Sequence, residues 1–165
     1  VDNQMGIWVY DDERYPGQNS GTEVNTVNVE VVNNVISNNP TYLDKSSAPG
    51  QYLAQNTQPK QFYSRFDYNA YYRANGPTQV LQQWDQQGGG IQYRSLAAFH
   101  GSWGFEAHGV DVASGPDPFF VNKAAQDYRI RPGSPAYRSG APVPADIAPL
   151  LGVPAGSVVS RGYMP

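Results

Sequence analysis

The first half of the chain alternates apolar and polar residues in short runs that turn residues separate. Every second residue from Val27 to Val31 is valine and the residues between are polar, which is the period of two of a half-buried strand. The adjacent Asn33 and Asn34 interrupt this run, an apolar pair follows at 35–36, and a Ser-Asn-Asn-Pro sequence ends it. The pattern predicts two short strands that meet at an asparagine corner.

The same design returns in residues 61–73, where aromatic residues flank an Asp-Tyr-Asn sequence. Asn69 follows Asn34 by 35 residues, and this offset places 35–36 over 70–71. Asparagine tolerates a left-handed backbone conformation, and asparagines stacked at one corner can hydrogen-bond one another. The alternative explanation of these residues is that asparagine is common in turns of every kind. A repeated unit of strand, corner, strand and loop is what a solenoid needs, because each turn of a solenoid buries its inward side chains against its neighbours.

The segments between and after these units predict other elements. Gly6–Tyr10 is a short β-prone run, and Thr41–Lys60 reads as a long loop rich in Ser, Pro, Gln and Gly. Val80–Trp84 and Ser95–Phe99 are expected to form short helical turns around a flexible link at Gly88–Gly90.

Regular patterning is lost towards the C-terminus. Pro118–Val121 and Tyr128–Ile130 are the last strand-like runs before a Pro-Gly-Ser-Pro turn. From Ala141 onward repeated prolines prevent long elements. We therefore expect a body formed by residues 1–140 and a Pro-rich tail, residues 141–165, packed on its outside.

Composition narrows the class of protein. The 165 residues suit a single domain, and they carry a formal charge of −3 with a pI near 5.2. No basic footprint points to nucleic acid or to an anionic membrane surface, and no apolar run approaches the roughly 20 residues that cross a bilayer. Cysteine is absent, which excludes disulfides and thiolate metal sites. Aromatic residues make up 13 % of the chain and supply enough apolar surface to oppose disorder.

Several motifs occur together and in order along the chain. They are an Asn-Asn unit at 32–36, an aromatic Asp-Tyr-Asn unit at 66–72 and a tryptophan at position 84. A Gly-x-Glu-x-His element follows at 104–108, an Asp-Pro-x-Phe element at 117–120 and a closing Arg-x-x-Pro-Gly-Ser-Pro-Ala sequence at 129–136. With these motifs the segment from about Gly6 to Gly140 resembles the C-terminal coils of a pectate-lyase-like right-handed parallel β-helix protein. The resemblance implies an all-β fold, a right-handed parallel β-helix that forms a short solenoid of few coils, with long loops and an irregular tail.

The resemblance also implies a function on polysaccharides. Similar closing coils occur in polysaccharide lyases, glycoside hydrolases and uronate epimerases, and in proteins without known catalysis. We therefore expect the C-terminal part of a secreted or cell-surface enzyme, a polysaccharide lyase or glycoside hydrolase, whose partner is a polysaccharide. The alternative is a noncatalytic structural or adhesive module of a surface filament or fibre. Catalytic residues of the family usually project from middle coils, which would precede Val1.

The first predicted coil has no capping helix. An uncapped solenoid end exposes an apolar cross-section that invites stacking. The sequence therefore predicts a partner chain on the N-terminal coil, either a fragment of a cleaved precursor or a second copy.

The richest cluster of chemical groups lies at 8–15, beside the end of the first predicted strand. Aromatic faces stack on sugar rings, Arg binds uronate carboxylates bidentately, and acidic residues bond hydroxyls or hold Ca²⁺, the one cofactor these residues suggest. Asp11 and Glu13 would face the same side of a strand and suit a glycosidase pair, and Arg14 would serve as a lyase base. The candidate catalytic residues are thus Asp11, Glu13 and Arg14, and the candidate substrate-binding residues are Trp8, Tyr10, Asp12, Tyr15 and Tyr72. A solvated loop without a partner is the alternative.

The remaining polar candidates are scattered. Lys60, Arg65 and Arg73 are further possible lyase bases, and nothing in the sequence selects among them. His100 and His108 lack the spacing of a metal site, so no metal is predicted from them. The Gly-x-Glu-x-His element, which contains Glu106 and His108, is mainly structural in the resemblance.

Aromatic residues of the second unit are divided between core and surface. Phe66 and Tyr68 are expected in the core, because alternate residues of such a strand face inward. The adjacent Tyr71 and Tyr72 must lie on opposite faces of a strand, so one of them is expected to be exposed and able to stack on a ligand.

Overall fold

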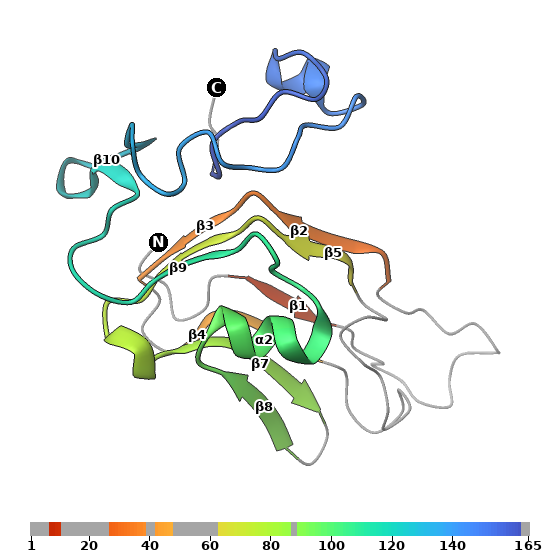
Figure 1. Cartoon of the computed structure of the whole chain (residues 1–165), viewed down its shortest axis with the longest axis vertical. Coiled ribbons are helices and arrows are strands. Elements are labelled where there is room, and N and C mark those ends of the chain that lie inside the picture. Colours follow the sequence, from red (N-terminus) through yellow and green to blue (C-terminus); the bar gives the residue numbers. More distant parts are fainter. Residues whose placement is uncertain (1–6, 11–26, 39–41, 48–62, 87–88, 163–165) are drawn as a thin grey trace.

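The structure is a computed structural model of the whole chain (Figure 1). Its described residues are 7–10, 27–38, 42–47, 63–86 and 89–162. Two strands near the N-terminus, β1 (Trp8–Tyr10) and β4 (Tyr42–Ser47), are described by their backbone pairing, in which β1 runs parallel to β4. The predicted strand in Gly6–Tyr10 is therefore confirmed.

Two units of strand, corner and strand stack on each other in the centre of the fold. The first unit consists of β2 (Val29–Val32) and β3 (Val35–Ser37), and the second of β5 (Tyr63–Asp67) and β6 (Ala70–Tyr72). β2 pairs in parallel with β5, and β3 pairs in parallel with β6 at an offset of 35 residues. The four strands, the two corners and their register are confirmed as predicted.

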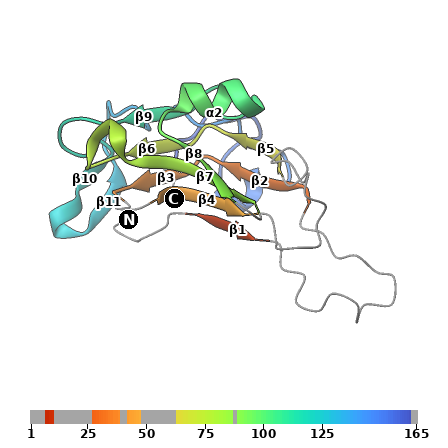
Figure 2. The same ribbon diagram turned by 90° about the horizontal axis from the view of Figure 1, so that it is seen from below.

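Further strands extend these pairs and form separate sheets. β9 (Val110–Val112) lies parallel to β6, and Figure 2 shows β9, β6 and β3 as successive layers. A four-stranded sheet has the order β1-β4-β7-β8, with β7 at Val80–Gln86 and β8 at Gly89–Tyr93. β10 (Phe120–Asn122) and β11 (Asp127–Ile130) form an antiparallel pair, which confirms the two strand-like runs predicted near the C-terminus.

The predicted right-handed parallel β-helix is wrong. The described strands form four small, separate sheets in which parallel and antiparallel pairs are mixed, and these strands close into no solenoid. β8 runs antiparallel to β7, and β10 runs antiparallel to β11. A solenoid must return the chain in the same direction at every turn, so the antiparallel partner of β7 ends the series of parallel strands on that side.

Two further predictions fail in the four-stranded sheet. The helical turn expected at Val80–Trp84 is strand β7, because pairing with β4 on one edge and β8 on the other outweighs local preference. Gly89 and Gly90, expected in a flexible link, belong to β8. The loop expected over Thr41–Lys60 contains β4, and the rest of that loop, from residue 48, lies outside the described residues.

The helical turn predicted at Ser95–Phe99 is confirmed as the start of α2 (Leu96–Trp103). The Ser95 hydroxyl oxygen caps the helix by accepting a hydrogen bond from the Ala98 N–H at 3.2 Å. The described 3-10 turns are η1 (Gly76–Thr78), η2 (Lys123–Ala125) and η3 (Ala148–Leu151). Within the described part of the chain, no helix has the length and apolar character needed to cross a membrane.

Aromatic side chains dominate the core between β5, β8 and α2. Phe66 is 1 % exposed, as predicted for the core, and packs edge-on against Tyr63 and Phe99 with ring centroids 4.8 and 5.6 Å apart. Edge-to-face pairs of this kind are favourable beyond the area that they bury. The core therefore holds β5 firmly against α2, which positions the site described below.

The segment after residue 139 packs against the first corner, beside β2 and β3 (Figure 1). Asn33 Oδ1 accepts a hydrogen bond from the Ala141 N–H at 2.6 Å, and its backbone oxygen accepts one from the Gly162 N–H at 2.6 Å. Pro142 and Val158 form an isolated β-bridge within the segment. One asparagine residue thus ties the tail to the stacked units.

Gly140 is a sensitive position in this contact. A Cβ there would lie 2.8 Å from both Asn33 Oδ1 and the Val159 backbone oxygen. We expect Gly140→Ala to lower the free energy of unfolding by about 1–3 kcal/mol, as overpacking does elsewhere. Gly101→Ala is the control, because a Cβ on this α2 residue meets nothing within 4 Å, and alanine should stabilise the helix by about 0.5–1 kcal/mol. Urea unfolding measures both, and equal midpoints would contradict the tight packing.

Candidate functional site

The candidate site forms where α2 ends beside β5. Gly104 ends the helix in the left-handed conformation at φ 77°, which glycine adopts without steric cost. Residues 105–109 then turn back over the second corner, where the Glu106 N–H donates to the Phe66 backbone oxygen at 2.8 Å. The end of α2 and the start of this return place residues 103–105 next to β5.

An open pocket of about 420 Å³ lies between β5 and that segment. Two half-buried aromatic side chains, Trp103 and Phe105, line it on one side. Its polar lining comes from β5, with the exposed Ser64 and the half-buried Arg65 and Asp67. The pocket therefore combines apolar ring surface with a hydroxyl, a guanidinium and a carboxylate.

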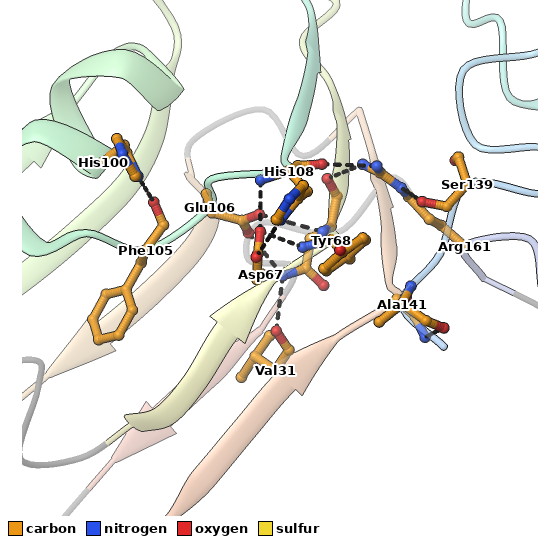
Figure 3. Close-up of polar contacts among 12 residues, drawn as sticks. Val31, Asp67, Tyr68, His100, Phe105, Glu106, His108, Ser139, Ala141 and Arg161 are labelled. Carbon is orange, nitrogen blue, oxygen red and sulfur yellow. Dashed lines mark hydrogen bonds and ion pairs between the residues drawn. The ribbon is translucent and has the colours of Figure 1, made fainter. Parts of the chain in front are cut away.

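Asp67 is held in place at the rim by the returning segment (Figure 3). Its Oδ1 accepts hydrogen bonds from the backbone N–H groups of Tyr68 and His108, both at 2.8 Å, and its Oδ2 lies 2.8 Å from His108 Nδ1. Burial alone would raise the pKa of Asp67, but the hydrogen bonds from His108 and Tyr68 outweigh it and lower this pKa below its ordinary value. Asp67 therefore presents a fixed negative charge.

The Tyr68 ring contacts the side chains of both His108 and Arg65 at the second corner. It is half-buried rather than in the core as predicted, with its backbone in the left-handed region at φ 60°. Its ring stacks on the His108 imidazole with centroids 4.4 Å apart, and the Arg65 guanidinium carbon lies 5.7 Å from the ring centroid. Such a cation–π contact restrains the Arg65 side chain next to the pocket.

A buried ladder of polar side chains lies beneath the site. The Asn34 N–H and Nδ2 both donate to Asn69 Oδ1, at 3.0 and 2.9 Å, so the predicted bonding between stacked asparagines is confirmed. Asn69 Nδ2 in turn donates to Glu106 Oε1 at 2.7 Å, and the Tyr71 hydroxyl donates to the same oxygen at 2.5 Å. Gln82 Nε2 donates to the Tyr71 hydroxyl at 3.1 Å. This chain of hydrogen bonds ends at the carboxyl group of Glu106.

Glu106, the acceptor of this ladder, is only 3 % exposed. Burial raises the pKa of Glu106 to about 7, although hydrogen bonds from Tyr71 and Asn69 oppose this rise. The geometry gives each part of the Gly-x-Glu-x-His element a structural role, in which Gly104 ends α2, Glu106 receives the ladder, and His108 holds Asp67.

Arg161 closes the corner from the tail side. It is 4 % exposed and donates from Nη1 to the Asn69 backbone oxygen at 2.9 Å and from Nη2 to the His108 backbone oxygen at 2.7 Å. Its Nε donates to the Ser139 backbone oxygen at 3.1 Å (Figure 3). Burial lowers the pKa of Arg161 below its ordinary value, and the nearby acidic groups of Glu106 and Asp67 oppose this shift only in part. Arg161 thus joins three chain segments through their carbonyl groups.

The sequence-predicted site residues are only partly placed by the structure. Trp8 and Tyr10 lie in β1, whose side chains are not described. The other candidates of this cluster lie outside the described residues: Asp11, Asp12, Glu13, Arg14 and Tyr15. Tyr71 and Tyr72 are 0 % and 8 % exposed, so the expected exposure of one of them is wrong. The reason is that both faces of β6 are covered, and the Tyr72 hydroxyl is bonded to the Gly115 backbone oxygen at 2.9 Å.

The three further candidate bases are separated by the fold. Lys60 lies outside the described residues. Arg73 is 3 % exposed, and its guanidinium is occupied by the Asp111 carboxylate and by backbone oxygens. Arg65 lines the pocket. Sequence reasoning named Arg65 without a reason to select it and missed Trp103, which lies 38 residues further along the chain. The helical start at Ser95, followed by a glycine at 104, was the available signal that Trp103 would lie at a helix end.

Within the described residues, no group of three or more His, Asp and Glu side chains is arranged to hold a metal ion. Comparisons with protein-family models, with curated proteins and with solved structures find no match to this chain. The geometry of the pocket is therefore the feature of this chain that indicates a function.

Proposed function

We propose that this chain binds a uronate-containing polysaccharide in the pocket along β5. The observation that supports this proposal is that Arg65 and the rings of Trp103 and Phe105 line the same open pocket of about 420 Å³. Its volume falls within the range of about 300–1,000 Å³ that ligand pockets occupy. Because the pocket is open, it suits one part of a long chain better than a small molecule that must be enclosed.

The residue types match the two surfaces of a sugar acid. The apolar face of a pyranose ring packs on an aromatic ring, for which Trp103 and Phe105 are available. A carboxylate pairs with a guanidinium through two parallel hydrogen bonds, for which Arg65 is available. The exposed Ser64 hydroxyl and the ionised Asp67 can bond sugar hydroxyls.

The pocket supports binding rather than hydrolysis. Hydrolysis of a glycosidic bond ordinarily needs two carboxyl groups that flank the bond. Among the described residues that line the pocket, Asp67 is the single carboxyl group, and Glu106 is buried in the ladder. Binding of this kind suits either a part of a polysaccharide-active enzyme or an adhesive module, and both would meet their ligand outside the cell or at its surface.

Isothermal titration with polygalacturonate oligomers tests the proposal. We expect saturable binding that weakens about tenfold or more in Arg65→Gln, because one charge-assisted interaction contributes about 1.5–3 kcal/mol. Arg129→Gln is the matched control: it removes the same charge from an exposed arginine that pairs with Asp127 on β11, away from the pocket lining. The control should bind as the unmodified chain does.

Oligomers whose carboxyl groups have been reduced to alcohols separate the roles of charge and ring. They should bind the unmodified chain more weakly and should not distinguish it from Arg65→Gln. Absence of binding to both oligomer types would refute the proposal. Equal loss of affinity in Arg65→Gln and Arg129→Gln would show that net charge, and not the pocket, attracts the ligand.

A further inference from the structure

We propose that a second polypeptide segment pairs with the outer edge of β2, and that its own corner asparagine bonds Asn34. Among the described strands, β2 pairs with β5 and with no other strand. Glu30 in the middle of β2 is exposed, and Val27, which leads into the strand, is 52 % exposed. Within the described part of the chain this edge of β2 is open, and an open strand edge is a template for another strand.

The backbone groups available at this edge follow from the alternation of a strand. The Val31 carbonyl accepts a hydrogen bond from Asn69 Nδ2 at 2.9 Å and therefore points towards the second unit. Successive peptide groups of a strand point in opposite directions, so the groups of Glu30 and Val32 point away from β5. The Val32 carbonyl accepts from Asn34 Nδ2 at 3.1 Å. The Glu30 N–H and carbonyl and the Val32 N–H therefore face the outer edge.

The asparagine ladder has a direction that leaves one acceptor at the same edge. Asn34 donates to Asn69, and Asn69 donates to Glu106, so the hydrogen bonds between the side chains run from the first unit inward. Asn34 Oδ1 receives no hydrogen bond from any described residue, although Asn34 is half-buried. A donor placed above Asn34, as Asn34 is placed above Asn69, would continue the ladder.

The second unit shows what chemistry the partner must have. β5 and β6 lie parallel to β2 and β3 and place Asn69 at the corner. We infer that the partner is a peptide segment of another chain with two short β-prone runs around a corner asparagine, aligned parallel to β2. Its backbone would pair with Glu30 and Val32, and its asparagine would donate to Asn34 Oδ1.

A labelled peptide with the sequence of residues 27–38 is the probe, because this segment already pairs in parallel with a unit of the same design. Fluorescence anisotropy with the whole chain should show saturable binding. The peptide carrying Asn34→Ala should bind about tenfold more weakly, since it lacks the side chain that donates to the chain's own Asn34. This comparison leaves the folded protein unchanged.

Two variants of the protein locate the edge. Glu30→Pro removes the outward N–H, which an edge strand tolerates, and should weaken peptide binding about tenfold or more, whereas Glu30→Ala keeps this N–H and should bind normally. Failure of the peptide to saturate at millimolar concentration, or equal binding of the Asn34→Ala peptide, would overturn the inference. Dimerisation of the chain alone in sedimentation analysis, abolished by Glu30→Pro, would assign the edge to a second copy and overturn the proposed partner.

Discussion

Replacing Asn69 with alanine should lower the free energy of unfolding by about 3 kcal/mol or more. The side chain is 0 % exposed, accepts two hydrogen bonds from Asn34, and donates to Val31 and Glu106. Its loss leaves several buried polar groups without partners, and each such group costs about 1–3 kcal/mol. Urea unfolding followed by tryptophan fluorescence measures the change.

Asn75→Ala is the matched control for this change. Asn75 is exposed, and its side chain makes no capping hydrogen bond to η1. Surface substitutions of this kind stay within about 0.5 kcal/mol of the unmodified protein. If Asn69→Ala were as stable as Asn75→Ala, the ladder would not stabilise the stacked corners, and the parallel pairing of the two units would need another explanation.

Because of Glu106, the free energy of unfolding should fall as the pH rises from about 4.5 to about 7. Burial raises the pKa of Glu106 to about 7 from its ordinary 4.5, and the hydrogen bonds from Tyr71 and Asn69 reduce this rise without cancelling it. Below pH 4.5 the folded and unfolded chains both hold the proton. Between 4.5 and about 7 only the folded chain holds it, so this group's contribution to stability falls as the pH rises and is lost above about 7.

Glu106→Gln should remove this pH dependence. The difference between the two pKa values corresponds to about 3 kcal/mol, so the variant should gain roughly this amount relative to the unmodified chain between about pH 4 and about pH 8. Urea unfolding at several pH values measures the gain. Glu30→Gln on the exposed β2 position provides the control, and its effect should be equally small at both ends of the range. A constant difference between Glu106→Gln and the unmodified chain would contradict a carboxyl group that is protonated in the fold.

Local pattern was enough to predict the stacked units. The period of two around Val29 and the paired asparagine corners define both the strands and their register, because a shift of one residue would move Val31 and Phe66 out of the core. The same reasoning failed at Val80–Trp84, where strand pairing on two edges decides the structure. Neighbours distant in the sequence supply those edges, and no window of local residues contains them.

The parallel β-helix was inferred from a repeat of two units and from the resemblance, and only β9 continues the parallel stack among the described strands. Parallel stacking at Asn34 and Asn69 is present, but the next element after β7 is an antiparallel strand. Two stacked units are compatible with many arrangements of the segments between them. The motifs that carried the resemblance lie in local structures, such as the helix end at Gly104, and the described strands around them do not form a parallel β-helix.

The pocket could not be predicted from the sequence for the same reason, because residues distant in the sequence line it. Arg65 was visible in the sequence as a possible lyase base, but Trp103 lines the same pocket only because the end of α2 lies beside β5. The cluster at 8–15 shows the opposite case: its residue types suit sugars, and its geometry lies outside the described residues.

The hydrogen bonds that join Arg161 to three chain segments also bear on the order in which the chain folds. Its hydrogen bond to the Asn69 carbonyl spans 92 residues, and that to the His108 carbonyl spans 53. Contacts between distant residues form late, because the entropy of closing a long loop opposes them until the rest has collapsed. During synthesis the carbonyl groups of the second corner must therefore remain hydrated until residue 161 has left the ribosome. The contacts that Arg161 makes with these carbonyl groups are then formed late in folding, once residue 161 is free to dock.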